Sequence, residues 1–220
     1  MKKITLLLIV LISIITHAQD TIQYKGQDIN ILDQNGLKAY TWKLYNEAKN
    51  VVIVSEFKDG ELNADTKYYK DYVLFASYNN SDELKIYKDD KTYKARFLRR
   101  PDGSQTLVDK RGDEINKDIA NYFYSLSTVY PMFYGGEDAL YSFIGNNVNG
   151  GSVNYASGRV VLSFVIDVDG KIIDIEVKES TNSALNNEAK RIVSLLPRWQ
   201  PAHQGGVFVK AQLSLPITFN

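Results

Sequence analysis

The fold of the C-terminal half is decided by residues 158–178, which read GRVVLSFVIDVDGKIIDIEVK. Residues 158–168 predict a strand that is apolar on both faces, and such a strand belongs at the centre of a sheet. Asp169-Gly170 is typical of a two-residue hairpin turn, which needs positive φ at Gly170. A return strand over residues 171–177 alternates apolar and charged residues and therefore predicts one buried face. That face consists of Ile173, Ile175 and Val177.

A helix and a third strand complete this unit. Residues 183–196 carry one apolar stripe at helical spacing, and Pro197 ends the helix. The stripe consists of Leu185, Ala189, Ile192, Val193 and Leu196. A single long strand is predicted from Val207 to Thr218. This order predicts an α+β domain in which a three-stranded, antiparallel-rich sheet carries one packed helix and keeps two open edges.

The rest of the chain divides by composition. Residues 20–115 break into short strand-like runs between turn signals, which favours antiparallel hairpins. Helical spacing from Glu114 to Leu126 predicts a short helix, and Glu137 to Ile144 predicts another, followed by a loop from Gly145 to Ser152. The predicted parts are a signal peptide (1–19), a β-rich domain (20–115), a helical linker (116–130) and a C-terminal domain (131–220).

Within the β-rich part, residues 67–72 interleave tyrosine and lysine as Lys-Tyr-Tyr-Lys-Asp-Tyr. This pattern favours a strand with one packed tyrosine face and with its lysines in water. The alternative is a ligand-binding surface.

Residues 1–19 have the composition of a secretory signal peptide. Lys2 and Lys3 precede an apolar run from Ile4 to Ile15, which is shorter than the roughly 20 residues that span a bilayer. Cleavage is expected after Ala18 or one residue later, and an uncleaved anchor is the alternative. We therefore expect an exported, periplasmic protein that is associated with the cell envelope and has no stable membrane span after cleavage.

The residues available for chemistry are few. The chain contains no cysteine, which excludes disulfides, thiolate catalysis and cysteine metal sites. His17 leaves with the signal peptide, so a two-histidine metal site cannot form. His203 stands in a turn-like stretch and is expected to be a solvated loop residue. With 26 basic and 26 acidic residues, the chain shows no charge excess that would indicate nucleic-acid binding. The sequence thus predicts no enzyme, no metal and no cofactor.

Four ordered motifs lie between residue 130 and the C-terminus. They are Pro131-Met132-Phe133-Tyr134-Gly135-Gly136-Glu137, the strand and turn from Gly158 to Gly170, Glu188-Ala189 followed by Pro197-Arg198-Trp199-Gln200-Pro201, and Leu215-Pro216-Ile217-Thr218-Phe219. Together they resemble the C-terminal domain of TonB in the form common in Bacteroidota. The positions that carry this resemblance are Gly135, Gly136, Gly158, Gly170, Glu188, Pro197, Trp199, Pro201 and Pro216.

The resemblance implies a periplasmic protein-binding domain that supports transmembrane transport and energy transduction at the outer membrane. In the family, a short extended receptor segment, the TonB box, pairs with the edge of the sheet, so that backbone hydrogen bonds supply the affinity. This chain departs from TonB in two ways. It has only five prolines and therefore no proline-rich arm, and residues 149–156 replace a Tyr-Pro-x-x-Ala element before the first strand. The binding domain is thus implied without the energising machinery.

The predicted last strand is the candidate partner-binding edge. The residues proposed for it are Val207, Phe208, Val209, Lys210, Ala211, Gln212, Leu213 and Ser214. A strand this long without proline leaves unpaired backbone groups that another segment can cover. The expected partner is a TonB box of an outer-membrane receptor or a second copy of the chain. Either the N-terminal domain or the loop from Gly145 to Ser152 could instead cover the edge. The alternative function is an exported envelope scaffold that uses this edge for self-association or cell-wall contacts.

Trp199 stands between two prolines. We predict that this rigid segment packs the indole into the core. The alternative is an exposed aromatic side chain that grips a partner.

Overall fold

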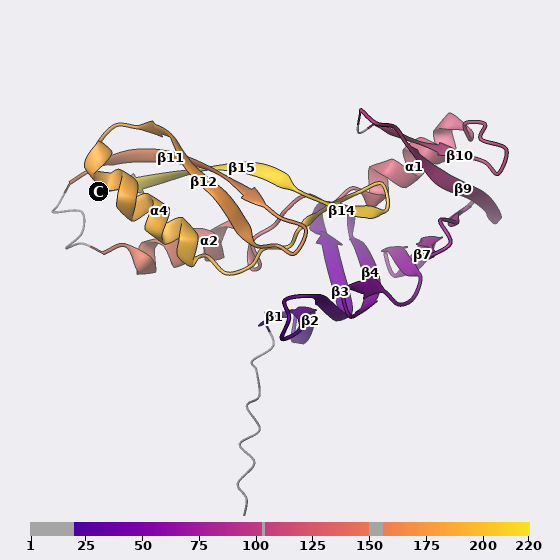
Figure 1. Ribbon diagram of the computed structural model, residues 1–220, viewed down its shortest axis with the longest axis horizontal. Helices are drawn as coiled ribbons and strands as arrows, with labels where there is room; N and C mark the ends of the chain where they lie inside the picture. The colour runs from indigo at the N-terminus through magenta and orange to yellow at the C-terminus, as the bar shows by residue number, and fades with distance from the viewer. Residues whose placement is uncertain (1–19, 103, 150–155) are drawn as a thin grey trace, which may run out of the picture.

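The computed structural model describes residues 20–102, 104–149 and 156–220 and shows two lobes side by side (Figure 1). The predicted signal peptide and part of the loop from Gly145 to Ser152 lie outside these ranges. The described residues combine mostly antiparallel sheets with a few helices, so the predicted α+β class is confirmed. None of the helices in the described ranges has the length and apolar content that a bilayer span requires.

The first lobe is an antiparallel sheet of ten strands, which confirms the β-rich prediction. The strands follow the order β1-β2-β3-β4-β6-β7-β8-β9-β10, and the short β5 pairs with β4. Consecutive strands are joined by short connections, so the sheet follows the order of the chain. The elements are β1 (Asp20–Tyr24), β2 (Gln27–Leu32), β3 (Lys38–Asn46), the 3₁₀ helix η1 (Glu47–Lys49), β4 (Val51–Lys58), β5 (Glu61–Leu62), β6 (Thr66–Lys70), β7 (Val73–Tyr78), β8 (Leu84–Lys88), β9 (Lys91–Arg99) and β10 (Gln105–Val108).

Helix α1 (Lys117–Ser127) packs against this sheet. It begins later than the predicted Glu114 because Asn116 caps it, with its side-chain oxygen accepting from the backbone N–H of Asp118 at 2.8 Å. On the buried side of α1, the ring of Phe123 lies 5.4 Å from that of Tyr68, which is fully buried.

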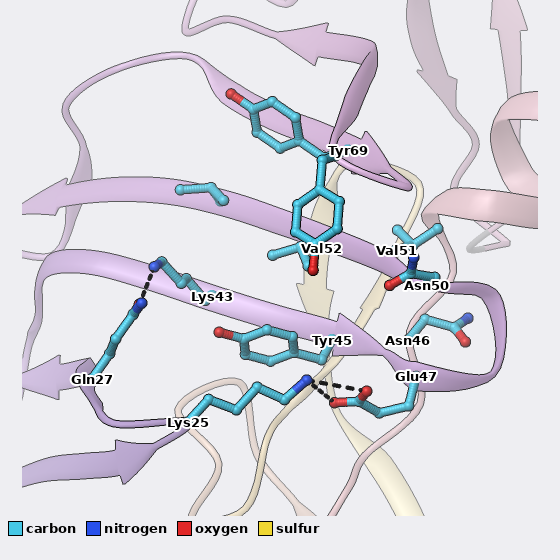
Figure 2. Close-up of a pocket in the computed structure, with 12 residues that line it drawn as sticks. Lys25, Gln27, Lys43, Tyr45, Asn46, Glu47, Asn50, Val51, Val52 and Tyr69 are labelled. Carbon is cyan, nitrogen blue, oxygen red and sulfur yellow. Dashed lines mark hydrogen bonds and ion pairs between the residues drawn. The ribbon is translucent and has the colours of Figure 1, made fainter.

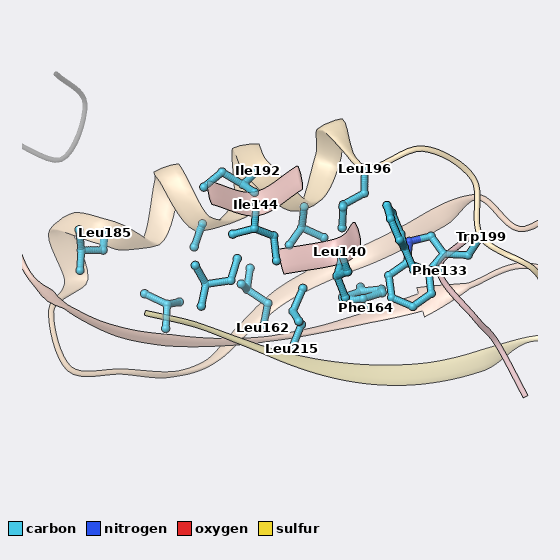
Figure 3. Packing of buried hydrophobic residues seen from close by; sticks show 14 of the residues in the cluster. Phe133, Leu140, Ile144, Leu162, Phe164, Leu185, Ile192, Leu196, Trp199 and Leu215 are labelled. Carbon is cyan, nitrogen blue, oxygen red and sulfur yellow. The ribbon is translucent and has the colours of Figure 1, made fainter. Parts of the chain in front are cut away.

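The second lobe is the three-stranded sheet β12-β11-β15, with α2 and α4 packed against it. Its elements are α2 (Gly136–Asn147), β11 (Gly158–Ile166), β12 (Ile172–Ser180), the 3₁₀ helix η2 (Ser183–Leu185), α4 (Asn186–Leu195) and β15 (Ala211–Phe219). The apolar strand β11 is central, as predicted. Every residue of the predicted helical stripe is buried. Figure 3 shows how this stripe and Leu140 and Ile144 of α2 meet the apolar side chains of the strands.

The hairpin between β11 and β12 differs from the predicted two-residue turn. The backbone N–H of Asp167 donates to the carbonyl of Lys171 at 2.9 Å, so three residues form the loop. Of these three residues, only Gly170 has positive φ, at +84°. The loop is therefore a turn followed by a left-handed glycine, the second common way to close a hairpin.

The prediction of which β12 side chains face the core is also wrong, at one residue. The pairing register shifts next to Asp174, whose φ is +55°, and this marks a β-bulge. Ile175 and Val177 pack against the core as predicted, but Ile172 joins them there in place of Ile173. Periodicity alone does not reveal a bulge, because one extra residue shifts the alternation.

The single strand predicted from Val207 to Thr218 is broken at Lys210. Its first part is β14 (Val207–Val209), which pairs with β13 (Ala202–Gln204), and only β15 pairs with β11. The β13–β14 hairpin packs into the first lobe, where the Phe208 ring lies 5.7 Å from that of Trp42. Figure 1 shows β14 beside β3 and β4. This long-range contact leaves no local signal in the sequence.

His203 lies on β13 and is 1% exposed, so the expected solvated position is wrong. Its backbone exchanges two hydrogen bonds of 2.9 Å with Val129. Nδ1 lies 3.2 Å from the carbonyl of Ser127, which accepts from the neutral ring. Burial lowers the pKa of His203 to about 4.

Substitution of Gly170 should destabilise the protein strongly. A Cβ there would lie 2.0 Å from the carbonyl oxygen of Trp199, in addition to the strain of positive φ. We expect Gly170→Ala to lower the free energy of unfolding by about 3 kcal/mol, measured by urea denaturation. Gly26 also has positive φ but has no atom within 4 Å of its Cβ position, so Gly26→Ala should cost only about 1 kcal/mol. If both variants lost the same amount of unfolding free energy, the close approach of Gly170 to the Trp199 carbonyl would be contradicted.

The free energy of unfolding should decrease as the pH is lowered, because His203 must stay neutral in the fold. An unfolded histidine titrates near 6.5, whereas the folded group has a pKa of about 4. Its contribution is therefore fully present above pH 6.5 and is lost as pH falls from 6.5 to 4, by about 3 kcal/mol in total. In His203→Gln, the pH dependence of the unfolding free energy over this window should become shallower. An unchanged slope would contradict the assignment to this histidine.

Candidate partner-binding edge

The outer edge of β15 is the candidate functional site. On its inner side β15 pairs with β11 along its whole length, from Ala211 opposite Ile166 to Phe219 opposite Gly158. No other strand among the described residues pairs with its outer side. One edge of β15 therefore carries backbone groups that have no ladder partner in the part of the chain that the structure describes.

Pro216 shows which of these backbone groups face outward. It lies opposite Val161 and has no N–H to give to the ladder, so this pair is a non-hydrogen-bonded one. Because hydrogen-bonded and non-hydrogen-bonded pairs alternate, the N–H groups of Gln212 and Ser214 also point away from β11. The outward N–H row is thus interrupted at Pro216, and Thr218 continues it beyond the proline.

A groove with a volume of about 350 Å³ runs beside this edge. Its second wall is α2, and its floor is apolar, with Leu140, Phe164 and Trp199. On the rim stands Tyr141, whose side chain is half exposed. A second hollow of about 360 Å³ continues along the strand past Tyr141 to Thr218. Backbone donors and an apolar groove therefore lie next to each other.

Trp199 forms part of this floor and is 7% exposed, so the core prediction is confirmed. Its ring lies 5.4 Å from that of Phe133 and 5.9 Å from that of Phe164. Its backbone N–H donates to the carbonyl of Gly170 at 2.8 Å, which ties the floor to the hairpin turn. The indole Nε1 is buried and has no hydrogen-bond partner among the described residues.

Glu188, a position of the family resemblance, holds the α2 wall in place. Its carboxylate accepts from the backbone N–H of Asn149 at 2.7 Å and from Arg191 at 2.7 Å. The same guanidinium donates to the carbonyl of Asn147, at the end of α2. The Arg191 guanidinium lowers the pKa of Glu188, so the carboxylate stays ionised in this pairing.

The eight predicted edge residues fall into two groups. Ala211, Gln212, Leu213 and Ser214 lie on β15, while Val207, Phe208 and Val209 lie on β14 and pair with β13. Lys210 stands between the two strands and is exposed. The Nε2 of Gln212 donates to Ser163 Oγ at 2.7 Å across the outer face of the sheet. Sequence reasoning missed the α2 wall, although the exposed Tyr141 within a predicted helix was a signal.

Sequence reasoning also missed Arg198 and Gln200, the residues on either side of Trp199. Arg198 is buried, and its guanidinium donates to the carbonyls of Asp20 and Asn30 at 2.6 and 2.7 Å. Gln200 donates to the carbonyl of Tyr45 at 2.8 Å and accepts from the N–H of that residue at 2.6 Å. Both side chains therefore bind the first lobe. The available signal was the polar–aromatic–polar alternation between two prolines, which indicates an extended segment with two sides.

The residues that the structure describes contain no cluster of acidic and histidine side chains that could hold a metal ion.

Residues 154–220 match the family described as Gram-negative bacterial TonB protein C-terminal. This match covers β11, α4 and β15, and hence the strand edge of the groove, but less than half of the chain. The matched part of the second lobe is thus similar to this family, which confirms the resemblance over residues 154–220. The chain matches no curated protein.

Removal of the indole should collapse the groove floor. We expect Trp199→Ala to lower the free energy of unfolding by about 3 to 5 kcal/mol because it leaves a cavity under Phe133 and Phe164. Trp199→Phe retains an aromatic ring and should cost less. Chemical denaturation of both variants measures the difference, and unchanged stability in Trp199→Ala would contradict the core role of this side chain.

Proposed function

We propose that this protein is a periplasmic, TonB-like binding module that engages an extended segment of an outer-membrane transporter by β-strand addition to β15. The observation that carries the proposal is the outer edge of β15, which no described strand covers and which lies beside an apolar groove. Strand addition needs both features, since backbone hydrogen bonds give affinity and a pocket for alternate side chains gives selectivity. The match of this lobe to the TonB C-terminal family supports a role in coupling energy to transport.

The geometry limits the length of the added strand. The break at Lys210 and the missing N–H of Pro216 make Ala211 to Leu215 the longest uninterrupted stretch for pairing. We infer a short partner segment with an apolar side chain directed at Leu140 and Phe164. A strand from a second copy of the chain could pair with the same edge. This is the occupant that the alternative function, an envelope scaffold, would require.

The binding experiment requires the whole chain after the predicted signal peptide. The β13–β14 hairpin and the side chains of Arg198 and Gln200 pack into the first lobe, so residues 131–220 alone would expose them. We therefore expect residues 131–220 to be less stable alone than within the whole chain.

Gln212→Pro should abolish binding of a synthetic TonB-box peptide while the protein stays folded. The substitution removes an outward N–H and leaves the inner ladder intact. Gln212→Ala is the matched control, because it also loses the side-chain bond to Ser163 but keeps the backbone donor. Calorimetry measures the affinities and circular dichroism the folding.

A folded Gln212→Pro protein that binds the peptide as tightly as wild type would rule out addition to this strand. Sedimentation of the wild-type protein tests the alternative occupant. A dimer that dissociates in Gln212→Pro would identify self-association at this edge.

A further inference from the structure

A pocket of about 440 Å³ lies on the first lobe, on strands that the proposed function does not use. Its floor is a row across three strands, in which Tyr45 of β3 pairs with Val52 of β4, and Val52 pairs with Tyr69 of β6. Figure 2 shows these side chains on one face of the sheet. All three are partly exposed, so this face offers a flat aromatic and aliphatic surface to solvent.

Tyr72 borders this pocket in an unfavourable backbone conformation. Its side chain is 92% exposed and its φ is +66°, a region that bulky residues avoid. The turn that carries it is fixed to the pocket wall, because the side chain of Asn50 donates to Asp71 Oδ1 at 2.6 Å. Packing does not explain a tyrosine here, since almost nothing covers the ring.

A comparison with the other tight hairpins shows how unusual a tyrosine is at the second position of such a turn. Five hairpins among the described residues close with two residues that both have positive φ. Glycine holds the second position in three of them, as this turn type prefers, and Asp90 holds it in the fourth. Of these five hairpins, only the β6–β7 turn has an aromatic residue, Tyr72, at the second position. Strain at an exposed residue indicates a functional constraint.

The remaining lining is polar but nearly neutral. Planar amides come from Gln27, Asn46 and Asn50. Each already binds within the protein, to Lys43, to the backbone of Lys49 and Thr128, and to Asp71 respectively, and each amide group has capacity for further hydrogen bonds. Lys25 lies 2.9 Å from a carboxylate oxygen of Glu47 and 4.9 Å from the centre of the Tyr45 ring. Lys43 binds Gln27, as Figure 2 shows. The charges are therefore largely satisfied within the pocket, and planar hydrogen-bonding groups stand around an aromatic floor.

Two kinds of ligand fit this arrangement poorly. A peptide strand would find no free backbone groups, because the side chains of Asn30 and Gln200 occupy those of Lys43 and Tyr45 along the edge of β3. A nucleic acid would need an excess of basic side chains along its phosphates. A sugar ring fits both features of the lining, because its C–H face stacks on aromatic rings and its hydroxyls bind amides.

We propose that this pocket binds a glycan chain and that Tyr72 stacks on one of its sugar rings. The site is distinct from the β15 edge, so the protein would contact two partners through different lobes.

A printed glycan array probed with the full chain after the predicted signal peptide identifies the binding oligosaccharide, and calorimetry with that oligosaccharide measures its affinity. Tyr72→Gly should lower this affinity roughly tenfold or more through the lost stacking. Tyr72→Phe should retain most of it. The melting temperature of Tyr72→Gly should be unchanged or higher, because glycine adopts positive φ without strain.

Asp90→Gly is the matched control, since it makes the same change in the same turn type away from the pocket. It should leave glycan binding unchanged, and neither variant should alter binding of the TonB-box peptide. The proposal is overturned if the wild-type protein binds no glycan, if binding survives in Tyr72→Gly, or if Tyr72→Gly loses stability and so reveals a packing role. Tyr72-dependent binding to a peptide array would assign the pocket to a peptide instead.

Discussion

The structure depends on the alternation of side chains along residues 198–200. Trp199 enters the core of the second lobe, while Arg198 and Gln200 point the other way and bind backbone groups of the first. Without them, the carbonyl of Asn30 and both backbone groups of Tyr45 would lose partners, and each buried group left unsatisfied costs about 1 to 3 kcal/mol. Two rigid prolines flank this segment and keep it extended. Each lobe is therefore completed by the other.

Local patterns predicted those parts of the fold that local physics decides. The central position of β11, the buried stripe of α4 and the core position of Trp199 follow from apolar periodicity. The bulge at Asp174 and the break at Lys210 could not be predicted, because both depend on what the strands pair with. The burial of His203 was missed for the same reason. Of the candidate site, the strand residues from Ala211 were foreseeable, whereas the α2 wall needed the tertiary structure.

The treatment of sheet edges explains where a binding site can form. Along β3, the side-chain amides of Asn30 and Gln200 bind alternate residues, Lys43 and Tyr45, as a neighbouring strand would. That edge is closed to an incoming segment. On β15 the described residues supply no such cover, and only Pro216 limits the exposed row. The side chains on β3 thus block strand addition there, whereas among the described residues β15 and β12 each end their sheet without a further strand.

The groove and the junction between the lobes share the same short segment, and this has a mechanical consequence. Trp199 forms the floor of the groove, and its two neighbours are held in the first lobe by hydrogen bonds. Any displacement of the indole by an occupant would have to break these bonds or bend the backbone between them. The first lobe therefore fixes the shape of a groove that it does not line. Such preorganisation lowers the entropic cost of ordering the groove when a ligand binds. A short added strand forms few hydrogen bonds and could offset only a small cost of this kind.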